Sequence, residues 1–455
     1  MIIVIIRRLI VYSVSVSLVE LIKSLINTEI GKMFRTTIIG VALLSVAFAV
    51  DAKPTLDEMY ELIQKQAAEI ATLKDGLAEN NAKTESTFTA VEEITSSPTA
   101  KLAEWATKTT MGGYGELHYN NHNSDNSTSS KDEFDLHRFV LFVGHEYNDK
   151  LRFFSEFEIE HALAGEGKGG EVEVEQAYIE WDYTEGHRAK AGVFLIPVGI
   201  LNETHEPPTF YGVERNPVEK NILPATWWEG GVMFSGELTQ GLSYDIGAHS
   251  GLYINGAEKV VADVGAAGDP VLGATSSGKY KIRDGRQKTS NAKGDDLAYT
   301  ARIKYTGIPG LELAATYQHQ EDVWQSEKIN GVEGVEADLI EAHLAYKKGP
   351  FGLRALYAQW DLDDNIETVK AGADEQEGWY IEPSFQVTKK LGVFARFNEY
   401  DNTAGGSQNS EKEQFDVGFN YYIHPRVVLK ADYFDQDNDS GTEYKGYNLG
   451  VGYDF

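Results

Sequence analysis

The residues of this chain that could act on another molecule are charged side chains in and around one segment, 197–227. The segment combines proline, aromatic and aliphatic residues with four carboxylates and two cations, which are Glu203, Glu206, Glu214, Arg215, Glu219 and Lys220. Segments with alternating polarity add basic side chains on their polar face: Arg138, Arg152, Arg188 and Lys190 on nearby segments, and Arg302, Lys304, Arg354, Arg396 and Lys430 on more distant ones. Carboxylates that face cations across a passage act on passing ions through their field. The same charges would also serve simply to solvate a polar interior.

Signatures of catalysis and of cofactor binding do not occur in the sequence. It holds no G-x-S-x-G, P-loop or Rossmann fingerprint. Its eleven histidines are scattered along the chain and do not predict a metal centre. Residues 435–443 resemble a calcium loop, but Gly441 lies one place late and Gly446 stands where a glutamate ligand is needed. We therefore expect no enzyme, no metal site and no cofactor, and a solvated surface loop at 435–443.

Composition narrows the class of protein further. The chain has 455 residues, a net charge of −29 and no cysteine. An acidic surface does not suit nucleic-acid phosphates, and the lack of cysteine removes disulfide scaffolds, thiolate zinc sites and thiol catalysis. Its 44 glycines, 24 tyrosines and 20 phenylalanines, with 12 prolines, favour many β-strands over a helical enzyme fold.

The N-terminal region predicts export from the cytoplasm. Residues 33–49 have a basic start, an apolar core and small residues at Ala47 and Ala49, as a secretory signal requires. We expect cleavage after residue 49, with an alternative site after residue 52. The apolar run is shorter than the roughly 20 residues that a spanning helix needs. Residues 1–32 precede a complete signal that begins at its own methionine, so we expect them to be an over-long start.

A short coiled coil is expected in residues 50–110, followed by a linker. Apolar residues occupy alternating spacings of three and four: Leu56, Met59, Ile63, Ile70, Leu73 and Leu77. Gln66 interrupts this seam, and the same frame resumes at Val91 and Ile94. Such a seam predicts self-association; the alternative is an amphipathic helix packed on its own domain. The polar residues 79–100 suggest a linker.

Residues 111–455 predict β-strands of about ten residues with two unlike faces. The last segment shows this best, because apolar residues from Tyr447 to Phe455 alternate with polar or small ones. Seven connections are short: 147–150, 184–187, 239–241, 306–310, 347–350, 388–390 and 424–426. Eight are mostly longer and polar: 120–133, 162–171, 197–227, 252–294, 321–334, 362–377, 401–411 and 435–443.

These fifteen connections join sixteen strands, with short turns at one rim and longer loops at the other. That layout predicts an all-β fold, a sixteen-stranded antiparallel transmembrane β-barrel with a wet lumen. Three places fit imperfectly. The alternation changes parity within 132–146 and within 171–183, and Pro383 would need a bulge or an irregular ladder position.

The connection 197–227 differs from the other long loops because it is rich in apolar residues and proline. A loop exposed to water has no reason to carry them, whereas a loop folded into the barrel and packed on its inner wall does. We therefore expect this loop to narrow the lumen.

The run from Phe194 to Gly231, FLIPVGILNETHEPPTFYGVERNPVEKNILPATWWEGG, resembles the corresponding region of the phosphate-selective porin O/P family. The last strand, with Tyr453 and Phe455, is similar to the assembly signal of outer-membrane barrels. The resemblance implies a trimeric, sixteen-stranded porin with an inward third loop, and the N-terminal coil is similar to that of some dicarboxylate-type trimeric porins. The family's phosphate preference depends on dense arginines and lysines, where this loop has four glutamates beside Arg215 and Lys220.

Together these features predict a Gram-negative outer-membrane porin that passes small hydrophilic solutes and ions by diffusion. The N-terminal segment would lie in the periplasm. The expected partners are outer-membrane lipid and lipopolysaccharide, the barrel assembly machinery, two further copies in a homotrimer, and small ions or solutes, with no nucleic acid. The alternative is a structural outer-membrane protein that tethers the envelope through its periplasmic coil.

Overall fold

A computed structural model of the chain describes residues 55–124, 130–254, 281–326, 334–363, 374–404, 410–439 and 443–455. The expected signal at 33–49, its alternative cleavage after residue 52 and the expected over-long start at 1–32 lie outside these residues. The chain divides into two compact units, residues 1–100 and 101–455, and each is described by itself.

In the first unit, α3 (Leu56–Ser96) is a helix of 41 residues. It begins with a capping box, in which Glu58 Oε2 accepts a hydrogen bond from Thr55 N at 2.8 Å. The predicted seam is exposed along it, with Ile63 57% and Leu73 70% accessible. The helix continues through residues 79–96, where the sequence suggested a linker. Local bonds support this continuation, for example the ion pair of Lys83 Nζ with Glu79 at 2.7 Å.

A second helix, α4 (Pro98–Lys108), follows and runs directly into the first strand. Proline at its first position is favourable, because the missing N–H has no partner there in any helix. No helix among the described residues has both the length and the apolar character needed to cross a bilayer.

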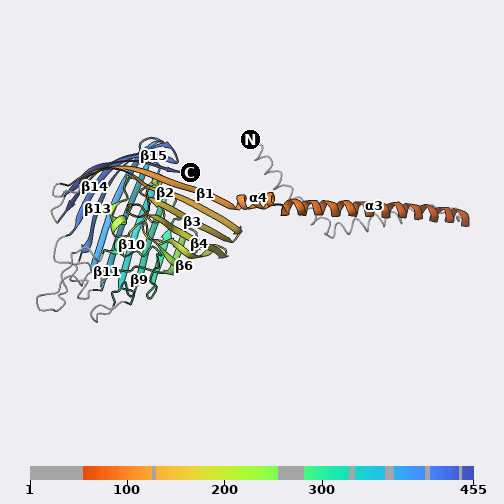
Figure 1. Cartoon of the computed structure of the whole chain (residues 1–455), viewed down its shortest axis with the longest axis horizontal. Helices are drawn as coiled ribbons and strands as arrows, with labels where there is room; N and C mark the ends of the chain where they lie inside the picture. The colour runs from red at the N-terminus through yellow and green to blue at the C-terminus, as the bar shows by residue number, and fades with distance from the viewer. Residues whose placement is uncertain are drawn as a thin grey trace. The chain divides into compact units, whose positions relative to one another are not determined.

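Sixteen antiparallel strands form the second unit (Figure 1). They are β1 (Thr109–Ser124), β2 (Lys131–Asn148), β3 (Leu151–Glu160), β4 (Val172–Thr184), β5 (His187–Leu195), β6 (Trp228–Thr239), β7 (Leu242–His249), β8 (Ala298–Tyr305), β9 (Leu311–Gln320), β10 (Ala337–Lys348), β11 (Phe351–Leu362), β12 (Glu375–Gln386), β13 (Leu391–Ala404), β14 (Lys412–His424), β15 (Val427–Asn438) and β16 (Tyr444–Asp454).

Each strand pairs with its neighbours in sequence, and β1 pairs with β16 to close the barrel. Beyond the last strand, Phe455 N donates to Gly113 O at 2.9 Å. Closure leaves no strand edge unpaired. The predicted strand number and the order of short and long connections are confirmed. β1 and β2 reach further into their predicted loop than the sequence suggested, because they are 16 and 18 residues long.

The two faces of the sheet differ as the alternation predicts. In β16, Tyr447 and Leu449 are 44% and 47% exposed on the outer face, whereas Asn448 between them is 2% exposed toward the lumen. Apolar side chains on the outside are suited to lipid, and the polar ones surround the interior.

Both predicted parity changes are β-bulges. The pairing of β1 with β2 shifts by one residue after Glu116 and leaves His137 as the extra residue. The pairing of β3 with β4 shifts after Glu156 and leaves Glu175 as the extra residue. A bulge turns two successive side chains to one face, so His137 and Arg138 both reach the lumen, as do Glu175 and Gln176.

Pro383 takes the irregular ladder position that the sequence allowed. It pairs with Leu353 of β11. On the side of β13, pairing is interrupted between Ile381 and Ser384 and resumes in the same register. Since proline has no N–H to donate, the sheet gives up a ladder bond at this point without inserting a residue.

Candidate functional site

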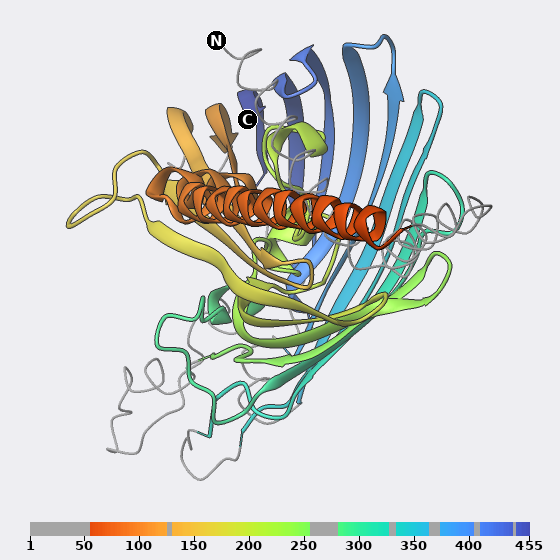
Figure 2. The ribbon, with the colours of Figure 1, turned by 90° about the vertical axis from the view of Figure 1, so that its right-hand side faces the viewer.

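The connection between β5 and β6, residues 196–227, lies within the ring of strands (Figure 2). We call it the inward loop. It contains the short helices η1 (Pro207–Thr209) and α5 (Pro217–Asn221). Its apolar side chains form one buried cluster with residues of the inner wall, among them Ile196, Val198, Val218, Ile222, Leu223 and Trp227 with Leu339, Leu356, Trp360 and Tyr380. Burial against the wall therefore explains the apolar composition of this loop.

Polar bonds fasten the inward loop to the side of the barrel away from β5 and β6. Trp360 Nε1 on β11 donates to Ile222 O at 2.9 Å. Asn420 Nδ2 on β14 donates to Phe210 O at 2.9 Å, and Lys430 Nζ on β15 donates to Gly212 O at 2.8 Å. β14 stands about halfway round the barrel from the strands that carry the loop. The loop therefore crosses the lumen.

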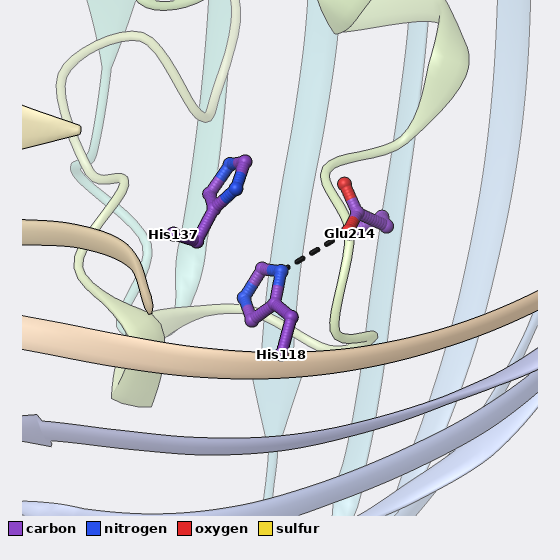
Figure 3. A group of neighbouring side chains, drawn as sticks. All are labelled: His118, His137 and Glu214. Carbon is purple, nitrogen blue, oxygen red and sulfur yellow. Dashed lines mark hydrogen bonds and ion pairs between the residues drawn. The ribbon is translucent and has the colours of Figure 1, made fainter. Parts of the chain in front are cut away.

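Three of the predicted loop carboxylates contact side chains of the wall, two of them at β8 and β1. Glu203 forms a short ion pair with Arg302. Glu214 Oε1 lies 3.0 Å from His118 Nδ1 and also accepts from Asn120 Nδ2 at 3.0 Å. Figure 3 shows His118 pointing from β1 toward Glu214, with His137 nearby. These contacts hold the loop against β8 and β1 as well.

Glu219 is fully buried and organises the inward loop itself. Its Oε2 accepts from Ile200 N at 2.9 Å and from Leu201 N at 2.5 Å. Its Oε1 accepts from the hydroxyl of Tyr380 at 2.8 Å, and its own N–H is capped by Asn216 Oδ1 at 2.8 Å. This carboxylate therefore joins the start of the loop, the helix α5 and the wall.

The other predicted loop charges have fewer contacts. Glu206 is half-buried beside η1. Arg215 Nη1 lies 3.4 Å from Thr226 Oγ1 within the loop. Lys220 is 46% exposed, with its Nζ 3.8 Å from Glu214 Oε2. Lys220 thus presents the most accessible cation of this group.

The predicted wall cations are mostly paired with carboxylates of the wall. Arg138 pairs with Glu116 at 2.9 Å, Arg152 with Glu180 at 2.6 Å and Arg396 with Glu382 at 3.0 Å. Arg188 shares Glu180 at 3.5 Å, and Arg354 lies 3.9 Å from Glu382. The guanidinium charges are therefore balanced locally.

The lysines of the wall make other contacts. Lys190 stands over the ring of Tyr178, and Lys430 stands over the ring of Phe210. Lys304 shares the face of Arg302 through its spacing of two residues.

Comparison with known proteins identifies the family. Residues 89–442 match the family described as Gram-negative porin. The chain belongs to this porin family. A relative described as an uncharacterized protein of Aquifex aeolicus is 31% identical over 359 residues, which cover 72% of this chain and 75% of the relative.

Solved structures that share the fold of this porin include proteins of Comamonas acidovorans and Pseudomonas putida. An anion-selective porin from Comamonas acidovorans is 14% identical, with 76% of this chain and 99% of that chain covered and a TM-score of 0.52. OprB of Pseudomonas putida is 10% identical, with 79% and 96% covered and a TM-score of 0.51. The predictions of a porin and of an outer-membrane location are confirmed. The protein is an outer-membrane channel for small solutes.

On the long-loop side, a cavity of about 580 Å³ opens above the inward loop of the porin. Glu214, Lys220 and three histidines line it, namely His122, His137 and His161. His137 Nδ1 and His161 Nδ1 lie 3.0 and 2.8 Å from the same oxygen, Asp135 Oδ2. The structure thus brings together histidines that lie far apart in the sequence.

We call His118, His122, His137 and His161 the histidine group, because His118 stacks on His137, which lines the cavity. Part of this group could have been found from the sequence. His118 and His122 are four residues apart, which places both on one face of a strand. His137 and His161 carry no such signal, because the bulge in β2 turns His137 inward and His161 lies beyond the end of β3.

Two ionisable groups of the inward loop have lowered pKa values for different reasons. Burial lowers the pKa of His205 to about 4, so this imidazole is neutral at pH 7. Burial alone would raise the pKa of Glu214, but the hydrogen bond from His118 and the charge of Lys220 hold that pKa well below its usual range. Glu214 therefore stays ionised beside the cavity.

Proposed function

We propose that the porin is a passive diffusion channel whose narrowest part is formed by the inward loop. The observation that supports this most strongly is the fastening of that loop to β11, β14 and β15, across the lumen from the strands that carry it. A loop held on both sides reduces the open cross-section of a sixteen-stranded barrel. Charges at such a point select ions by their local field.

We further propose that the channel prefers cations and is not phosphate-selective. Capture of phosphate needs guanidinium or ammonium groups that are free to bind an anion. Here Arg138, Arg152, Arg302 and Arg396 all contact carboxylates. The chain as a whole carries a net charge of −29.

Planar-bilayer recording of the purified porin tests both proposals. We expect stepwise conductance, and in a KCl gradient a reversal potential of the sign that cation preference gives. Glu203→Gln would release Arg302 from one of its two carboxylates and shift the reversal potential toward anions. Glu237→Gln, near the end of β6 where its carboxylate accepts from Gly241 N of the short turn, is the matched control. An anion-selective wild type blocked by millimolar phosphate would refute the selectivity proposal.

The exposed seam of α3 supports a homotrimer. Leu56, Ile63, Ile70 and Leu77 are more than half exposed along one side of a helix of 41 residues. A regular seam of this kind is stable when further copies of the same helix cover it. We propose that two more copies of this chain do so in the periplasm. Deletion of residues 54–94 should then weaken the trimer while each barrel still conducts; loss of envelope integrity with unchanged solute uptake would favour the structural tether instead.

We also propose how the porin is exported and assembled in the outer membrane. Residues 33–49 would be removed as a signal peptide, with residues 1–32 not forming part of the translated protein. Tyr453 and Phe455 would be recognised by the barrel assembly machinery, and the outer surface would contact lipid and lipopolysaccharide. The intact mass of the protein from isolated outer membranes tests the cleavage site, because cleavage after residue 49 or 52 gives different masses.

A further inference from the structure

Three buried ligand atoms converge where the inward loop meets β3 and β4. They are Glu156 Oε1, Glu175 Oε2 and His205 Nε2, and all lie within 4.8 Å of one another. His205 Nε2 is 3.4 Å from Glu156 Oε1 and 3.7 Å from Glu175 Oε2. The three residues are 1%, 0% and 3% exposed.

Each of these three atoms lacks a hydrogen-bond partner among the described residues, although the other polar atom of each side chain has one. Glu156 Oε2 accepts from Gln176 Nε2 at 2.6 Å. Glu175 Oε1 accepts from Thr226 Oγ1 at 3.0 Å. The hydrogen bonds therefore hold each side chain in place, and the three atoms without a partner face one another.

The tautomer of His205 follows from its other contact. His205 Nδ1 lies 3.1 Å from the backbone carbonyl oxygen of Asn202, which can only accept. Nδ1 must then carry the proton, which leaves a lone pair on Nε2. With both carboxylates ionised, the cluster presents three electron-pair donors and no proton donor. Buried acceptors without a donor are costly, and a cation satisfies all three at once.

Nearby protein cations are engaged elsewhere. Arg138 contacts Glu116 at 2.9 Å and Glu158 at 3.3 Å. Among the described residues, no lysine or arginine nitrogen lies within ion-pair distance of Glu156 or Glu175. Arg215 Nη1 contacts Thr226 Oγ1 at 3.4 Å and pairs with neither carboxylate. The two buried carboxylates thus form no direct ion pair with a lysine or arginine of the described residues.

We propose that Glu156, Glu175 and His205 bind one divalent transition-metal ion of the Zn²⁺ type, which attaches the inward loop to the barrel wall. Zinc bonds of about 2.0–2.2 Å in a tetrahedral site place ligand atoms roughly 3.3–3.6 Å apart. The observed 3.4 and 3.7 Å need little adjustment. The bulge at Glu175 makes the site, since it turns Glu175 and Gln176 to the same face.

Gln176 and Thr226 have the role of outer partners that orient metal ligands. The site goes beyond channel function, because it fixes the position of the loop whether or not that loop sets conductance.

The test measures metal content rather than current. The porin is stripped with a chelator while unfolded, refolded in detergent with Zn²⁺ or Co²⁺, freed of unbound metal and analysed by mass spectrometry for metal per chain. We expect one ion per chain and, with Co²⁺, a visible absorption band typical of a tetrahedral site. Glu175→Gln and His205→Gln should lose both signals. His137→Gln is the matched control, because it alters the histidine group at the cavity and leaves the proposed ligands intact.

Variants of the outer partners keep the proposal testable if the ligand variants fail to fold. Gln176→Ala and Thr226→Val retain all three ligands and should weaken metal affinity by about 10- to 100-fold. A refolded wild type that retains no metal would overturn the proposal. So would loss of the ion in His137→Gln with retention in Glu175→Gln, which would place the metal at the histidine group instead.

Discussion

Glu219→Ala should release the inward loop from the wall. The substitution removes the acceptor for Ile200 N and Leu201 N, both of which are buried. Each buried N–H left without a partner costs about 1–3 kcal/mol, so the docked loop should lose about 2–6 kcal/mol relative to a detached one. Because about 1.4 kcal/mol corresponds to a factor of ten, even the lower value raises the detached population roughly 30-fold.

Limited proteolysis and single-channel recording would detect that release. Trypsin should cut Glu219→Ala in the inward loop at Arg215 or Lys220 much faster than wild type, while the barrel stays folded. The open conductance should rise and become noisier as the loop leaves the lumen.

Glu219→Gln is the matched control for this prediction. Its amide oxygen can still accept from both backbone N–H groups, so the loop should stay largely docked. If Glu219→Ala were cut no faster than wild type and conducted like it, the role given to this carboxylate in loop docking would be wrong.

Three further predictions concern other parts of the molecule. Leu73→Asp should weaken the trimer in light scattering of the purified protein at decreasing concentration, whereas Ala71→Asp beside the seam should not; equal effects would argue against the seam. Phe455→Ala should lower the amount of folded protein in outer membranes, because its ring stacks on Phe139 with 6.2 Å between centroids, and an unchanged amount would contradict this. Trp360→Phe should remove the bond to Ile222 O, worth about 1 kcal/mol, and give a smaller rise in tryptic cleavage than Glu219→Ala; no rise would show that this contact adds nothing.

The barrel could be predicted because its main requirement is local. Each strand must present an apolar face to lipid and a polar face to the lumen, and this requirement appears in the sequence as alternation of single residues. Tyr447 and Asn448 follow the pattern closely. The inward position of residues 197–227 was also predictable, since Trp227 and Leu223 would have no partner in a loop outside the barrel.

The detailed contacts of the lumen could not be predicted in the same way. Parity indicates which face a side chain occupies but not which partner it meets across the barrel. Glu203 contacts the wall cation Arg302, whereas Glu219 accepts from two backbone N–H groups of the loop and from the hydroxyl of Tyr380 on the wall. The cluster of Glu156, Glu175 and His205 depends on a bulge and on a contact between a loop and two strands. Single-sequence periodicity contains neither.

We propose that solutes pass the inward loop on their way through the barrel. The chain has no cysteine, so a single introduced thiol can be labelled selectively. Lys220→Cys, on the exposed side of that loop, and Lys389→Cys, in the short turn before β13, should be labelled with a bulky charged thiol reagent during bilayer recording. We expect a stepwise fall in conductance for Lys220→Cys and little change for Lys389→Cys. Unchanged conductance in a fully labelled Lys220→Cys channel would contradict it.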